Sequence, residues 1–265
     1  MLRFFFPFLL LISLTGLSQE TFGLRWKIAL NEIHAWDADQ GAFLYLYNNE
    51  EFSKIDSTGK RVLTQSPKSL GNISKIDATN WLKLAVFSEE QQQVCYLDNA
   101  LSIQGQCIQL TDYKVELAQL VATSVQTDRL WVFDQLNSEL RLITLRSAQQ
   151  QTVMNMRSIL DFGMPKQLFE FGNQLYITDA EGQIAIFDNY GTFIGSEKFE
   201  GSFIQPFQNA LLVANGNEIY AQNLETGEKV PFFSFVSEKN IEQFSFNGRN
   251  LYVGTASEIF CFRLK

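Results

Sequence analysis

The segment LYITD, residues 175–179, shows the pattern that decides the fold: a leucine, three mostly apolar residues and a small polar residue. A short apolar run that ends in a turn-forming residue is typical of a β-strand. The pattern occurs six times, as LYLYN (44–48), LAVFS (84–88), LWVFD (130–134), LYITD (175–179), LLVAN (211–215) and LYVGT (251–255). The leucines that begin successive copies are 40, 46, 45, 36 and 40 residues apart, which indicates an internal repeat.

Three further strand-like segments accompany most copies. One follows directly, as EFSKID (51–56), QQVCYLD (92–98), ELRLITL (139–145), GQIAIFD (182–188), EIYAQNL (218–224) and EIFCFRL (258–264). The next comes after a turn, as RVLTQ (61–65), SIQGQ (102–106), AQQQTV (148–153), TFIGS (192–196) and KVPFF (229–233). Another precedes the leucine, as EIHAWDA (32–38), NISKIDA (72–78), KQLFEF (166–171), FIQPF (203–207) and EQFSF (242–246). In the third unit, residues 115–124 have helical propensity, but their place in the repeat predicts a strand.

Four strands in about 40 residues is the size of a propeller blade, and stacking blades in a ring buries both faces of each. The sixth unit ends at Lys265, one strand short. Residues 23–27 (GLRWK) resemble the outer-strand start GEKV (227–230), so we expect residues 24–30 to pair with residues 258–264. The prediction is an all-β, six-bladed β-propeller of four-stranded antiparallel blades. It is a single domain over residues 19–265, and its sixth blade is closed by the N-terminal strand.

One unit carries a family likeness. LYITDAEGQIAIFDNYGTFIG (175–195) resembles a repeat of NHL- and YVTN-type propellers in Leu175-Tyr176, Asp179, residues 184–188 and Gly191. It departs from that family because the usual opening strand with Pro-Gly is absent. The resemblance implies a protein that binds proteins or small ligands, since a minority of such propellers are enzymes.

The first residues predict export. A short basic start, Met1-Leu2-Arg3, precedes the apolar run 4–14, and Gly16 and Ser18 precede a plausible cleavage point before Gln19. We interpret residues 1–18 as a secretory signal peptide, with a buried strand or an uncleaved anchor as the alternatives. The expected location is therefore periplasmic or extracellular. The rest of the sequence has no segment long and apolar enough to predict a transmembrane anchor.

The net charge limits the kinds of partner that we expect. Removing Arg3 leaves 20 basic and 29 acidic residues, a net charge of −9, with no basic block, so we expect no nucleic-acid partner. We expect a monomer.

Cys95 and Cys107 could form a disulfide if their strands are adjacent, but the simplest hairpin register places Cys95 near Gln104 instead. Buried free thiols are therefore the favoured interpretation for these two cysteines and for Cys261.

The candidate site is a ring of polar residues, one at the end of each repeated strand, where the connecting loops share one face of the propeller. Its members are Asn48, Ser88, Asp134, Asp179, Asn215 and Thr255. They either converge as a ligand-binding ring or merely cap their own turns. Asp134 and Asp179, in neighbouring blades, could act as an acid–base pair or hold a hard cation with amide oxygens.

Other chemistry is poorly supported. His34 is the only histidine, and no nucleotide-binding or nucleophile motif occurs, so we expect no catalytic set, cofactor or metal site. The favoured function is a binding or scaffolding module that engages a protein, peptide or glycan through its loop face. The alternatives are a hydrolase or lyase that uses loop-face carboxylates, with or without a divalent cation, and a structural subunit of an envelope assembly.

Overall fold

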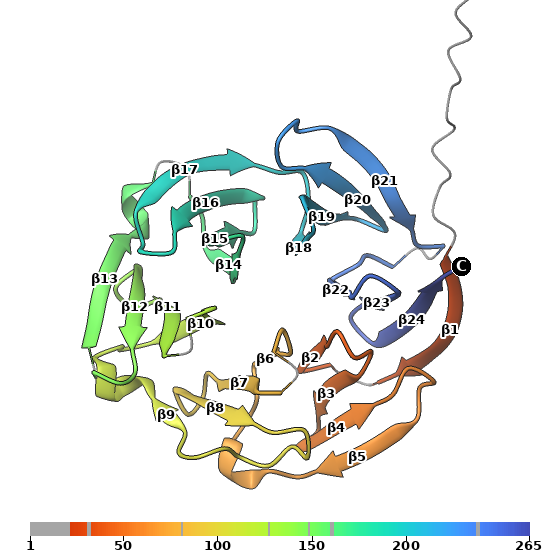
Figure 1. Ribbon diagram of the computed structural model, residues 1–265, viewed down its shortest axis with the longest axis horizontal. Coiled ribbons are helices and arrows are strands. Elements are labelled where there is room, and N and C mark those ends of the chain that lie inside the picture. Colours follow the sequence, from red (N-terminus) through yellow and green to blue (C-terminus); the bar gives the residue numbers. More distant parts are fainter. Residues whose placement is uncertain are drawn as a thin grey trace, which may run out of the picture.

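The computed structural model describes residues 22–30, 33–80, 82–126, 128–147, 149–159, 162–236 and 239–265. These residues form six four-stranded antiparallel sheets, arranged around a central axis as the blades of a propeller (Figure 1). In the described chain, helical structure is limited to three short 3₁₀ turns: η1 (Lys68–Leu70), η2 (Leu110–Tyr113) and η3 (Met156–Ser158). The predicted fold class and blade number are confirmed.

In the first five blades, the strands follow one another from the axis outward. Blades 1 and 2 contain β2 (Ala35–Ala38), β3 (Leu44–Asn48), β4 (Glu51–Ile55), β5 (Arg61–Gln65), β6 (Lys75–Asp77), β7 (Leu84–Ser88), β8 (Gln93–Leu97) and β9 (Ile108–Gln109). Blade 3 contains β10 (Ala118–Thr123), β11 (Arg129–Asp134), β12 (Glu139–Thr144) and β13 (Gln149–Asn155). Residues 118–123 are thus a strand, as their place in the repeat predicts.

Blades 4 and 5 follow the same plan, with β14 (Pro165–Phe171), β15 (Gln174–Asp179), β16 (Gln183–Asp188), β17 (Phe193–Lys198), β18 (Phe203–Phe207), β19 (Ala210–Asn215), β20 (Glu218–Asn223) and β21 (Lys229–Ser234). Blade 6 has the order β22 (Gln243–Phe246), β23 (Asn250–Gly254), β24 (Glu258–Leu264) and β1 (Phe22–Ala29). β1 pairs antiparallel with β24, from Phe22 opposite Leu264 to Ala29 opposite Glu258. The two ends of the described chain therefore meet in one sheet, and the predicted ring closure is confirmed (Figure 1).

The repeated pattern is apolar because its strand is covered on both faces. The second strand of each blade lies between two other strands and is flanked by the neighbouring blades, so every residue of β7 and β23 is buried. The outermost strands alternate or are largely exposed, as β17 shows. Hydrophobic clusters fill the space between successive blades, and the cluster between blades 5 and 6 is rich in phenylalanine. Phe22 of β1 packs there, with ring centroids 5.4 Å from Phe232 and 5.5 Å from Phe233.

The outer edge of blade 2 differs from the prediction. We expected a strand over residues 102–106, but only Ile103 bridges to Leu97, and the outermost strand is the two-residue β9. Leu97 pairs with Ile103 and Val94 pairs with Ile108, so three steps along β8 are matched by five along its partner. Gly105, at a φ of 74°, lies within this irregular segment, in a backbone conformation that favours glycine.

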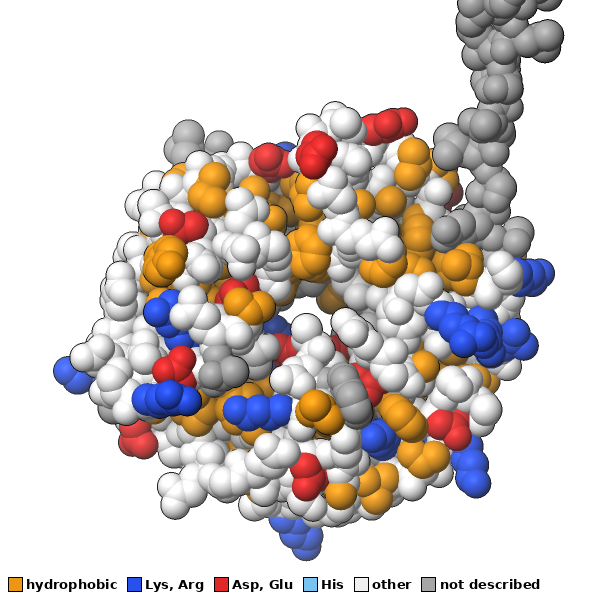
Figure 2. All heavy atoms as spheres, in the orientation of Figure 1, with side chains coloured by type: hydrophobic (Ala, Val, Ile, Leu, Met, Phe, Trp, Pro, Cys, Tyr) orange, Lys and Arg blue, Asp and Glu red, His pale blue; other side chains and the backbone are white. Residues whose placement is uncertain are grey.

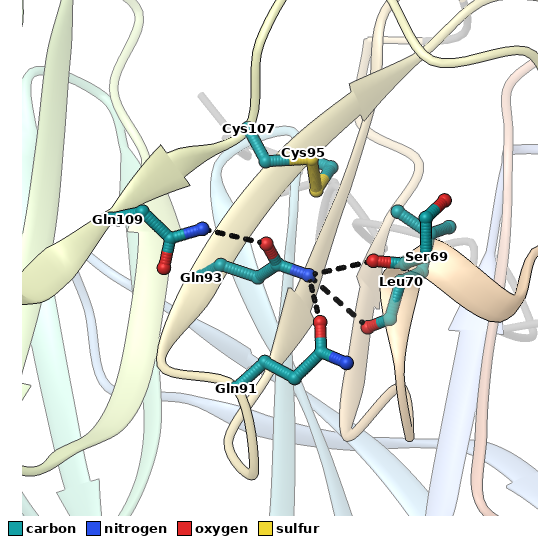
Figure 3. Close-up of a disulfide and its surroundings, with 7 residues drawn as sticks. All are labelled: Ser69, Leu70, Gln91, Gln93, Cys95, Cys107 and Gln109. Carbon is teal, nitrogen blue, oxygen red and sulfur yellow. Dashed lines mark hydrogen bonds between the residues drawn. A yellow bond between two sulfur atoms is a disulfide. The ribbon is translucent and has the colours of Figure 1, made fainter.

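The partner segment of β8 thus contains two extra residues, and because of them the prediction of free thiols at Cys95 and Cys107 is wrong. They bring Cys107 opposite Cys95, with the Cα atoms 4.4 Å apart, and the pair forms a disulfide rather than two free thiols (Figure 3). Gln93 lies beside it and ties the blade together, because its Nε2 donates to Ser69 O at 3.1 Å and its Oε1 accepts from Gln109 Nε2 at 2.9 Å. Cys261 is free and buried, as predicted, and burial raises the pKa of its thiol to about 12.

The predicted signal peptide, residues 1–18, lies outside the described residues. The described part of the chain contains no helix that is long and apolar enough to cross a lipid bilayer.

Candidate functional site

The innermost strands β2, β6, β10, β14, β18 and β22 surround a central opening, and Figure 2 shows acidic and basic side chains at its edge. Glutamine side chains form hydrogen bonds across several of the contacts between neighbouring blades, which we call seams. Gln205 Nε2 donates to Phe246 O at 3.0 Å while its Oε1 accepts from Phe246 N–H at 2.7 Å. The same pair of bonds joins Gln167 to Ile204, at 3.0 and 2.9 Å, and Gln92 to Ala118. Each amide side chain thus behaves like a one-residue extension of the neighbouring strand.

The seam between blades 1 and 2 uses a carboxylate instead. Asp37 of β2 accepts from Ala78 N–H at 2.9 Å and from Ala38 N–H at 2.8 Å. Asp77 of β6 holds the next seam, because it accepts from the Thr123 hydroxyl at 2.6 Å. A carboxylate accepts hydrogen bonds but has no proton to donate unless it is protonated.

The positive charge of Lys75 lies near the carboxyl groups of Asp37 and Asp77 in this part of the channel. Lys75 Nζ reaches from blade 2 to Val121 O at 2.6 Å in blade 3 and to Leu168 O at 3.1 Å in blade 4. Burial lowers the pKa of Lys75, although the nearby Asp77 and Asp37 oppose that shift. Burial also raises the pKa of Asp37 to about 7, helped by the charge of Asp77 and opposed by its backbone hydrogen bonds. Asp37 is therefore a carboxyl group that titrates near neutral pH.

The six predicted site residues all lie at the same end of their blades, where the second strand turns into the third. We call this side, together with the connections between blades, the loop face. The residues are one strand away from the channel and differ in exposure. Ser88, Asp134, Asp179 and Thr255 are buried, Asn48 is half-buried and Asn215 is exposed.

Asp134 is held by the connection that enters its own blade. Its Oδ2 accepts from Glu116 N–H at 3.1 Å and its Oδ1 accepts from Leu117 N–H at 3.2 Å. The guanidinium of Arg141 lies 3.3 Å from Oδ2 and also contacts Glu139 at 2.8 Å. The charge of this buried carboxylate is thus paired, and its oxygens fix residues 116–117 in place.

Asp179 repeats this arrangement in blade 4. Its Oδ2 accepts from Gly163 N–H at 2.7 Å, and its Oδ1 accepts from the N–H groups of Glu181 at 3.0 Å and Gln183 at 2.8 Å. A Cβ atom at Gly163 would overlap Glu181 Oε2, so the absence of a side chain allows this close approach. No direct interaction joins Asp179 to Asp134 in the described structure; each carboxylate serves its own blade.

The other four residues have local partners or none. The Ser88 hydroxyl accepts from Gln91 N–H at 3.3 Å, and the Thr255 hydroxyl accepts from Glu258 N–H at 3.2 Å. Asn48 Oδ1 is buried without a hydrogen-bond partner among the described residues. The turn-capping interpretation therefore describes Ser88, Asp179 and Thr255 in this structure, whereas the backbone donors to Asp134 belong to the connection that enters its blade. A ligand-binding role for the ring remains a prediction.

Exposed apolar residues at the loop face were missed by the sequence analysis. Leu117, Leu136 and Met164 are 36, 58 and 54% exposed. The signal that could have found them is their position, since Leu117 and Met164 directly precede inner strands where other blades carry polar residues. The described residues contain no group of three or more His, Cys, Asp or Glu side chains placed to hold a metal ion.

No family model and no curated protein matches the sequence. Solved structures match it over nearly its whole length. A structural-genomics protein of unknown function from Bacteroides thetaiotaomicron aligns with a TM-score of 0.69 and 12% identity over 93% of this chain and 72% of that one. Virginiamycin B lyase from Staphylococcus aureus aligns with a TM-score of 0.62 and 10% identity over 92% of this chain and 100% of the lyase. The Pan2 WD40 domain from Neurospora crassa aligns with a TM-score of 0.63 and 9% identity, covering 93% and 96%. At such identities the likeness shows the propeller fold alone.

Proposed function

We propose that this six-bladed propeller is an exported binding module that holds a protein, peptide or glycan against its loop face. The observation that carries the proposal is that the carboxylates of Asp134 and Asp179 bind the backbone of two loop-face connections. Their oxygens hold the connections at residues 116–117 and 163, and these connections present exposed side chains beside them. Loops fixed on a rigid scaffold are a common basis for recognition.

The same contacts weigh against the hydrolase or lyase alternative at this face. A catalytic carboxylate must reach the substrate, whereas Asp134 is fully buried and paired with Arg141, and Asp179 accepts three backbone hydrogen bonds. The loop face therefore supports a binding function better than an acid–base function.

The disulfide supports export. Structural disulfides persist in oxidising compartments and are rare in the cytosol of mesophiles. The Cys95–Cys107 disulfide joins β8 to β9, two strands that are otherwise paired through only two residue pairs. Together with the apolar run at residues 4–14, it favours a periplasmic or extracellular location. Fractionation of the native host, with non-reducing peptide mass spectrometry, tests this. A cytosolic protein in which Cys95 and Cys107 are both free to react with an alkylating agent would refute export.

Photocrosslinking tests binding through the loop face. A photoreactive amino acid is placed at Glu90, Ala180 or Ala256 on the loop face, and at Ser57, Asn99 or Thr226 on the opposite face. All six positions are exposed. We expect a discrete crosslinked partner from at least one loop-face position and none from the opposite face. Equal crosslinking from both faces, or none from either, would contradict the proposal.

A further inference from the structure

The residue before each innermost strand differs around the ring. These residues are His34, Ser74, Leu117, Met164, Ser202 and Glu242, so a large aliphatic side chain occurs at this position only in blades 3 and 4. Leu117 and Met164 belong to neighbouring blades, whose inner strands β10 and β14 pack against each other. Both are therefore at the same level of the loop face, beside the channel.

A third exposed apolar residue lies near Leu117 on the same face. Leu136 lies in the turn after Asp134, and the preceding residue Gln135 donates its N–H to Leu117 O at 2.8 Å. We call Leu117, Leu136 and Met164 the mouth ridge. Exposing grouped aliphatic side chains costs free energy in water, and such patches often mark interaction sites.

The mouth ridge is held in place by the predicted site aspartates. Asp134 binds the N–H of Leu117 itself, and Asp179 binds the N–H of Gly163, which precedes Met164. The two buried carboxylates thus fix the backbone from which these exposed side chains project. A preformed surface loses less conformational entropy when a partner binds.

Acidic side chains flank the mouth ridge. Glu116 is adjacent to Leu117, and Glu181 lies over Gly163, next to Met164. Both are exposed, and neither carboxylate has an ion pair or a side-chain hydrogen bond within the part of the chain that the structure describes. A partner that covers the ridge would meet these two negative charges at its edge, which favours positive charges flanking its apolar side chains.

We propose that the mouth ridge is the docking surface for an extended peptide segment whose large aliphatic residues are flanked by Lys or Arg. This inference rests on the proposed function and specifies its partner. The aliphatic side chains of the peptide pack on Leu117, Leu136 and Met164, and its basic side chains lie toward Glu116 and Glu181. Asp134 and Asp179 act as positioning residues and do not contact the peptide.

The test uses a labelled peptide containing Lys-Leu-Gly-Leu-Lys, measured by fluorescence anisotropy with the intact protein at physiological salt. Peptides with Ser in place of Leu, or Glu in place of Lys, are the ligand controls. We expect both to bind at least about tenfold more weakly. Binding of the Ser peptide as tightly as the Leu peptide would reduce the interaction to charge attraction by this acidic protein and overturn the proposal, as would no binding of the Leu peptide at millimolar concentration.

Variants locate the contact. The double change Leu117→Ser and Met164→Ser should weaken binding of the Leu peptide by about tenfold or more, because both side chains are central to the ridge. Glu116→Gln with Glu181→Gln should weaken it about threefold and reduce its salt dependence. Val125→Ser is the matched control, since Val125 is 69% exposed and lies beyond the opposite end of β10. An equal loss in this control would refute the assignment.

The outcome is separable from that of the proposed function. If a partner crosslinks to the loop face and the Leu117→Ser, Met164→Ser protein still captures it with unchanged efficiency, the binding module stands and the mouth ridge is refuted as its docking surface. If no loop-face position crosslinks, the proposed function fails first.

Discussion

The carboxyl group of Asp37 makes the stability of this protein depend on pH in an unusual direction. Burial raises its pKa from 3.8 to about 7 in the folded protein. The folded state therefore binds the proton more tightly than the unfolded chain does. The resulting stabilisation is fully present below about pH 4 and is lost as the pH rises through 7.

The size of the effect follows from that shift. A shift of about 3 pKa units corresponds to about 4 kcal/mol, and about 2 to 3 kcal/mol of this is lost between pH 5 and pH 8. This is an upper bound because Asp37 is partly open to the channel, where water and salt screen its charge. The charged groups that face it are Asp77 and Lys75. Lys75 remains bonded to two backbone carbonyls in this structure.

Urea unfolding, followed by tryptophan fluorescence at pH 5, 6, 7 and 8 and constant ionic strength, measures this dependence. We expect Asp37→Asn to remove most of the change in unfolding free energy between pH 5 and pH 8. Its absolute stability is expected to be lower at every pH, because an amide offers only one acceptor oxygen to the N–H groups of Ala38 and Ala78. The comparison is therefore between slopes.

Asp188→Asn is the control. Backbone N–H donation, first of all from Thr192, lowers the pKa of Asp188, so this group titrates below the measured range. Its variant should keep the wild-type slope. The reasoning is refuted if Asp37→Asn retains the full pH dependence, or if the control loses it.

Three further predictions concern the closure and the seams of the ring. Phe22→Ala should destabilise the fold by about 2 kcal/mol in urea unfolding, because the half-buried ring contacts Phe232 and Phe233; a cost below about 0.5 kcal/mol would show that these contacts do not hold β1. Cys95→Ala with Cys107→Ala should cost about 3 kcal/mol, as expected for a crosslink with a sequence separation of 12, and unchanged thermal unfolding would contradict a structural role. Gln205→Ala should cost about 1 to 3 kcal/mol by leaving both backbone groups of Phe246 without this partner, and hydrogen exchange at Phe246 should accelerate. Protection equal to that of the wild type would refute a structural role for the two Gln205–Phe246 hydrogen bonds.

The ring could be predicted from the sequence because its determinants are local and repeated. The segments at 44–48 and 84–88 are strands with the predicted bounds, since each buries an apolar run and ends at a turn residue. The pairing of β1 with β24 also followed from the sequence, because the last unit lacked one strand and a matching segment stood at the other end.

The disulfide and the contacts of the candidate site could not be predicted, because they depend on irregular geometry and on contacts between blades. A two-residue slip near Gly105 decides the disulfide, and no regular hairpin register includes it. The carboxylates of Asp134 and Asp179 were recognised as candidates, but their bonds to the connections at residues 116–117 and 163 come from N–H groups 16 to 18 positions away in the sequence. The partners of Lys75 are 46 and 93 residues away, in two other blades. Such contacts arise only when the ring is assembled.

The meeting of β1 and β24 also orders events during synthesis. Among the described strands, β1 is synthesised first and its partner β24 is synthesised last. Until Glu258–Leu264 is available, the early strand has no sheet to join, and its exposed edge can pair with other chains. A nascent chain therefore carries an unpaired edge until β24 is available, so this architecture favours a cell that shields the polypeptide until that strand has been made.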